Sequence, residues 1–190
     1  MTAKEKSPFD TNISKNRLEF LFDGIFAIAM TILVLELKLP EQIHDKRSVD
    51  ELGQALLHHW RTFLSYIISF VILSGFWIGH NTLYAKLARI TKAILAIHVW
   101  LLVWAAFIPF CAHLLGRYPS NPAAFAVYLS TAFAYAVGLL ALIITADRQK
   151  AFDATVSAVD VRRLRRGLIR SLIGMVFLIL YNVFIMPVLR

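Results

Sequence analysis

Five long apolar runs, separated by shorter polar stretches, organise the sequence. They cover roughly residues 18–39, 62–79, 93–115, 123–146 and 167–189. As an α-helix rising about 1.5 Å per residue, each run is long enough to cross about 30 Å of hydrocarbon. Apolar and polar residues do not alternate within the runs, which argues against transmembrane β-strands. The pattern therefore predicts an all-α, polytopic transmembrane helical bundle with five spans, forming a single integral membrane domain over residues 1–190.

Local patterns predict where some helices begin and end. Pro40 ends the first helix, and Ser48 followed by Glu51 forms a capping box that starts a new helix before Leu52. That helix either lies on the membrane surface or runs straight into the second span. The stretch 147–166 is a long non-apolar segment and predicts polar helical extensions.

Composition narrows the class of protein. The chain of 190 residues is 58% hydrophobic and 17% charged, against roughly 45–50% and about 25% in average globular proteins. This excludes a disordered tail, a disulfide scaffold and most soluble enzymes. Cys111 is the single cysteine, so an intrachain disulfide is impossible.

The basic residues predict the topology of the bundle. The net charge is +8, and 14 of the 20 basic residues fall in the tail 1–17, the connection 86–92 and the segment 148–170. These three segments share one side if the helices alternate, and cytoplasmic loops are enriched in Lys and Arg. We therefore expect a cytoplasmic N-terminus and no role in nucleic-acid binding. The cluster Arg162–Arg170 is best explained as a topological anchor, with anionic-lipid binding as an additional role.

The first span carries an acid on one side and a mostly apolar stripe on another. At about 100° per residue, Ile28, Ile32 and Leu35 lie within roughly 60° of one another, with Thr31 at the edge. Asp23 points about 140° away from Ile28, toward packed protein. An ionisable group inside a bilayer is a functional candidate, although Asp23 could equally accept hydrogen bonds that hold the bundle together. The stripe suits a pore of apolar and hydroxyl rings, but such stripes also serve helix packing or lipid contact.

The first span resembles the transmembrane protein 175 family of potassium channels. The family signature is Arg-x-x-x-Phe-Ser-Asp, which bacterial members continue as Gly-[Val/Ile]-Phe-Ala-Ile-x-x-Thr-[Leu/Ile]-Leu-Val-Leu-Glu. The sequence matches this signature at Arg17, Asp23, Gly24, Ile25, Phe26, Ala27, Ile28, Thr31, Ile32, Leu33, Val34, Leu35 and Glu36. Shorter resemblances are Ser69-Phe70, Trp77 and His80 in the second span, and Phe107-Ile108-Pro109-Phe110, Leu114-Leu115-Gly116 and Tyr118 in the third.

The resemblance implies a homotetrameric, potassium-preferring cation channel in a bacterial plasma membrane. Ile28 would be the hydrophobic constriction of the pore, Thr31 the selectivity layer, and Ile32 and Leu35 further pore-lining residues. Such a channel conducts passively, so its partners would be potassium ions and the lipid bilayer, and it would be no enzyme and require no cofactor.

The resemblance also assigns the first-helix motif residues Arg17 and Asp23 to bracing that helix against its neighbours. His80 lies at the same level of the membrane and is added to this group. Two features depart from the family: Leu21-Phe22 replaces the Phe-Ser pair, and only five of the usual six helices are readable.

Two alternative functions compete with the channel. The histidines at 58, 59, 80, 98 and 113 suggest a haem-binding or enzymatic membrane protein, with His98 as the candidate haem ligand. No recognisable metal-ligand pair accompanies them, so no metal site is predicted. The missing sixth helix leaves open a second alternative, a non-conducting structural or regulatory membrane subunit. The absence of a Thr-Val-Gly-Tyr-Gly filter means that any selectivity does not come from stacked backbone carbonyls.

Overall fold

The computed structural model describes residues 14–35, 37 and 48–185. In this part of the chain six α-helices follow one another: α1 (Lys15–Leu35), α2 (Val49–His58), α3 (Trp60–Ala85), α4 (Lys92–Arg117), α5 (Pro122–Arg148) and α6 (Ala158–Leu180). A π-helical turn, η1 (Tyr181–Ile185), continues α6. Five helices are long and apolar enough to cross a membrane, which confirms the predicted all-α bundle with five spans. Residues 36, 38–39 and 186–189 of the predicted spans, including Glu36, lie outside the described residues.

The helices extend beyond the apolar runs that reveal them. The last one begins at Ala158, whereas its apolar run begins at Gly167. The Ser157 hydroxyl accepts from the Asp160 backbone N–H, and the Asp160 carboxylate accepts from the Ser157 backbone N–H, so the capping box starts the helix in its polar part. The length of an apolar run indicates how much of a helix lies in the hydrocarbon, whereas the capping residues determine where the helix begins.

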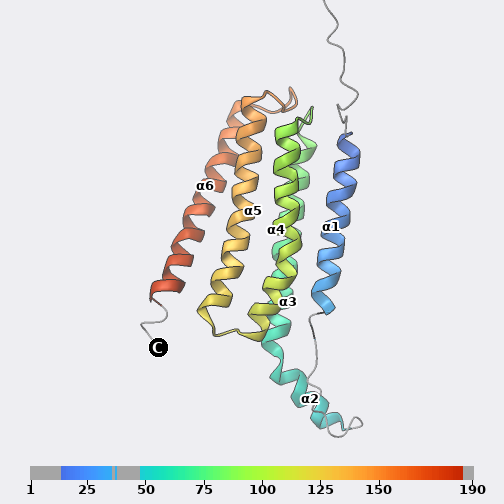
Figure 1. Ribbon diagram of the computed structural model, residues 1–190, viewed down its shortest axis with the longest axis vertical. Coiled ribbons are helices and arrows are strands. Elements are labelled where there is room, and N and C mark those ends of the chain that lie inside the picture. The colour runs from blue at the N-terminus through green and yellow to red at the C-terminus, as the bar shows by residue number, and fades with distance from the viewer. Residues whose placement is uncertain (1–13, 36, 38–47, 186–190) are drawn as a thin grey trace, which may run out of the picture.

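The short helix α2 accounts for the predicted capping box. The Ser48 Oγ accepts from the Glu51 backbone N–H at 3.2 Å, as the sequence predicts. With ten residues, α2 is too short to cross the bilayer. His59 interrupts the helix between α2 and α3, and α2 is angled away from the bundle below α3 (Figure 1).

Helix α4 occupies the middle of the bundle. It packs against α1, α3 and α5, while α6 packs on the far side of α5 (Figure 1). At Gly138 of α5 an added Cβ would lie 2.7 Å from side-chain atoms of both Leu101 and Trp100 on α4. This glycine therefore permits a close approach of the two helices. By contrast, Gly75 and Gly79 of α3 have no such neighbour within 4 Å and are exposed.

The connections 86–91 and 149–157 are hydrogen-bonded to each other at one end of the bundle, and we call this pair of loops the clasp. The Ala88 backbone N–H donates to Ala151 O at 2.8 Å, and the Asp153 N–H donates to Lys86 O at 2.9 Å. The ammonium group of Lys15 donates to Leu87 O at 2.8 Å, in the same connection. The start of α1 is thereby tied to the connection after α3. The described basic segments that the sequence assigns to one side of the membrane gather at this end.

Candidate functional site

Helix α1 has one face buried in the bundle and another left open. Its buried residues recur at helical spacing: Leu18, Phe22, Phe26, Ala29 and Leu33. The predicted stripe lies on the uncovered side, where Ile28 is 59% exposed, Ile32 39% and Leu35 68%, and Thr31 is also exposed. The chain thus brings the four stripe residues together without using them in its own packing.

The hydroxyl of Thr31 is oriented by its own helix. Its Oγ1 donates to the Ile28 carbonyl oxygen at 2.8 Å. Because the hydroxyl proton is used in this bond, the oxygen lone pairs remain available on the exposed face. The arrangement offers an acceptor oxygen directly beside the apolar side chain of Ile28.

Asp23 of α1 is hydrogen-bonded to a side chain of α3. The indole N–H of Trp77 donates to Asp23 Oδ1 at 2.8 Å. This contact supports the structural interpretation of the acid, because the carboxylate is turned to a neighbouring helix and not to the open stripe. Arg17, the other motif residue with a proposed bracing role, is exposed near the start of α1.

His80 meets α1 through Phe22. Both side chains are about 1% exposed, and their rings stack with centroids 3.3 Å apart at 12°. The His80 Nε2 lies 3.1 Å from Nδ1 of His98 on α4, a hydrogen bond between two imidazoles. The three side chains Phe22, His80 and His98 thus join α1, α3 and α4. His98, the candidate haem ligand, is buried within this cluster.

Some contacts that hold α1 in place cannot be predicted from the sequence. Phe22 counts as a departure from the family signature, yet its ring fills the junction beside His80. The Lys15 contact with the connection after α3 joins residues about 70 positions apart and has no local sequence pattern. Within the described ranges, no group of three or more His, Cys, Asp or Glu side chains is arranged to hold a metal ion.

These features place the chain among polytopic α-helical membrane proteins, with an exposed, mostly apolar stripe on the first helix. Residues 17–109, which include nearly all of α1, together with α2, α3 and most of α4, match the sequence profile of the family described as the endosomal/lysosomal potassium channel TMEM175. The predicted resemblance to this family is confirmed. The family is one of ion channels and not of enzymes.

Named relatives occur in bacteria and animals. A potassium channel of Chamaesiphon minutus is 34% identical over 110 residues, covering 57% of this chain and 52% of the relative. A potassium channel of Streptomyces collinus is 29% identical over 130 residues, covering 66% and 61%. The human endosomal/lysosomal proton channel TMEM175 is 26% identical over 115 residues, covering 58% and 23%. The chain thus spans little more than half the length of the bacterial relatives it matches.

The fold has a counterpart among solved structures. The crystal structure of a lysosomal potassium-selective channel TMEM175 homolog from Chamaesiphon minutus superposes with a TM-score of 0.75 at 26% sequence identity. The match covers 92% of this chain and 89% of that one. The similarity therefore extends beyond α4 to nearly the whole bundle.

Replacing Phe22 with serine, the residue of the family signature, should destabilise this protein. The ring is buried against His80 and Phe26, and removing a buried phenylalanine side chain typically costs about 3–5 kcal/mol. We expect Phe22→Ser to lower the thermal denaturation midpoint in detergent by several degrees. Phe20→Ser is the matched control, because Phe20 is 76% exposed. Equal midpoints for the two variants would contradict the role given to the Phe22 ring.

Proposed function

We propose that the protein is a homotetrameric, potassium-preferring cation channel that conducts passively through a central pore lined by α1. Ile28 forms the hydrophobic constriction, Thr31 the selectivity layer, and Ile32 and Leu35 line the pore further along. The chain sits in a bacterial plasma membrane with its N-terminus in the cytoplasm.

The observation that carries this proposal is the uncovered stripe on α1. A single chain buries the opposite face of the helix and leaves Ile28, Thr31 and Ile32 partly exposed. Copies of α1 placed around an axis would turn the stripe into stacked rings. Apolar rings of sufficient narrowness gate a pore by dewetting. The similarity to bacterial potassium channels, one of them a potassium-selective homolog of known crystal structure, supports the same function.

The choice of potassium rests on the hydroxyl layer and on the bacterial relatives. Thr31 offers oxygen lone pairs next to the constriction, and hydroxyl oxygens can replace part of the hydration shell of a cation. The matched bacterial relatives are named potassium channels, whereas the animal relatives are named proton channels. Potassium is therefore the proposed permeant ion.

The residues Arg17, Asp23 and His80 hold the pore helix in position. Asp23 binds Trp77, and His80 packs on Phe22, so two adjacent residues of α1 are fixed to α3. Arg17 is exposed at the end of the helix where the basic segments gather. That end faces the cytoplasm, because basic residues are enriched in cytoplasmic loops.

Ile28→Asn should increase potassium leak. An amide at the constriction hydrates the narrow ring, and each 1.4 kcal/mol removed from a permeation barrier raises the rate about tenfold. We expect at least about a tenfold rise in potassium flux from liposomes that contain the purified protein. Ile173→Asn is the matched control, because Ile173 is 64% exposed on α6. If wild type and Ile28→Asn both give no flux above empty liposomes, the protein is a non-conducting subunit.

Removing the Thr31 hydroxyl should weaken the preference for potassium over sodium. Thr31→Val keeps the shape of the side chain but removes the oxygen, whereas Thr31→Ser keeps the oxygen. In planar bilayers with potassium on one side and sodium on the other, Thr31→Val and Thr31→Ala should move the reversal potential toward zero. Thr31→Ser should stay near wild type. An unmoved reversal potential in Thr31→Val would show that this hydroxyl does not select the ion.

The proposed assembly places four copies of Ile28 around one axis. Native mass spectrometry of the purified protein should give the mass of four chains. In a Cys111→Ala background, Ile28→Cys should be blocked by a thiol-reactive cation applied during flux measurements. Cysteine at Phe26, on the buried face of α1, should resist the reagent. Two chains per particle, or equal block at the two positions, would contradict a tetramer lined by α1.

A further inference from the structure

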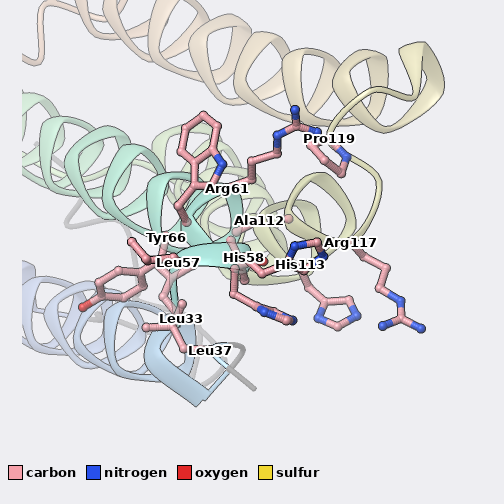
Figure 2. Close-up of a pocket in the computed structure, with 14 residues that line it drawn as sticks. Leu33, Leu37, Leu57, His58, Arg61, Tyr66, Ala112, His113, Arg117 and Pro119 are labelled. Atoms are coloured by element: carbon pink, nitrogen blue, oxygen red, sulfur yellow. The ribbon is translucent and has the colours of Figure 1, made fainter. Parts of the chain in front are cut away.

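An amphipathic pocket lies at the end of the bundle opposite the clasp. It encloses about 580 Å³ between the end of α1, the α2–α3 junction and the end of α4. One part of its lining is apolar, with Leu33, Leu37, Leu57 and Ala112. In Figure 2 the side chains of Leu33 and Leu37 lie on one side of the pocket, and His58, His113 and Arg117 lie on another.

The remaining lining is unusually rich in nitrogen-bearing side chains. Two guanidinium groups, Arg61 and Arg117, accompany the three imidazoles of His58, His59 and His113. Among the residues that the structure describes, the lining includes no Asp or Glu. The acids of α2, Asp50 and Glu51, occupy its first turn, at the far end of that helix from His58. The described part of the lining therefore carries two guanidinium charges and no carboxylate.

The pocket also lies at the expected level of a membrane–water interface. The membrane-length helix α3 begins at Trp60, and α4 ends at Arg117 and is followed by Tyr118. Trp and Tyr are enriched where hydrocarbon meets headgroups. The Arg61 guanidinium lies over the Trp60 ring at 5.7 Å, a cation–π contact that holds it at this level.

We propose that this pocket binds the headgroup phosphate of an anionic phospholipid. Guanidinium groups bind phosphate oxygens through paired N–H donors, and Arg61 and Arg117 are both exposed and able to reach an anion. The apolar side formed by Leu33, Leu37 and Leu57 accepts the first part of an acyl chain. An anion with no apolar tail would use only half of this lining.

The structure favours this pocket over the other basic region. The cluster at Arg162–Arg170 lies along one largely exposed helix face, which attracts anionic lipid through charge alone. At the pocket, the α2–α3 junction and α4 both contribute charged groups to a lining that also has an apolar side. Site-specific binding is therefore expected at the pocket.

The test is photolabelling of the full chain in nanodiscs, with peptide mapping by mass spectrometry. One set of nanodiscs contains a trace of photoactivatable phosphatidylglycerol. The other set contains the same amount of photoactivatable phosphatidylcholine with the same acyl chains. We expect labelling of residues 57–66 and 112–119 to be at least about tenfold higher with phosphatidylglycerol. Equal labelling of these residues by the two lipids would overturn the proposal without the need for any variant.

Matched variants locate the charge requirement. R61Q/R117Q should lose the phosphatidylglycerol preference at the pocket, whereas R61K/R117K, which keeps both charges but not the paired N–H donors, should retain part of it. R162Q/R163Q removes the same charge from the other end of the bundle and should also retain it. Unchanged preference in R61Q/R117Q, with a wild-type gel-filtration profile, would overturn the proposal. Loss of labelling on adding inorganic phosphate would overturn the lipid assignment, because a free anion would then suffice.

Discussion

The bundle depends on how α1 is held, because lipid does not drive apolar helix faces together. Inside a bilayer, an apolar side chain gains little by leaving the hydrocarbon, so close packing and polar contacts decide which faces meet. For α1 these contacts are the stacking of Phe22 on His80 and the bond from Trp77 to Asp23. Together with the Lys15 contact at the clasp, they fix both the rotation and the start of the helix.

Fixing the rotation of α1 determines what it leaves exposed. With Phe22, Phe26 and Leu33 buried, Ile28 and Thr31 must lie on the open side of the same helix. The bracing residues and the proposed pore residues therefore share one helix but have separate roles. A change at Phe22 would act on conduction only through the position of α1, whereas a change at Ile28 would act on the permeation path itself.

Phe22, which replaces the serine of the family signature, is accommodated by neighbouring side chains. Phenylalanine at position 22 removes a hydroxyl beside Asp23, but the carboxylate keeps a hydrogen-bond donor in Trp77. The larger ring is accommodated against His80, which in turn binds His98.

The two ends of the bundle also differ in construction. One end is closed by backbone hydrogen bonds between loops, and the amphipathic pocket lies at the other end.

The five spans, the cap of α2 at Ser48 and the stripe on α1 are predictable from the residues alone. These features follow from hydropathy, helical periodicity and short capping patterns, all of which are local. The contacts of Phe22 with His80 and His98, the bond from Lys15 to Leu87 and the pocket shared by Arg61 and Arg117 are visible only in the folded chain. The physical reason is that faces turned to lipid, protein or a pore are all apolar, so periodicity identifies a face but not its neighbour.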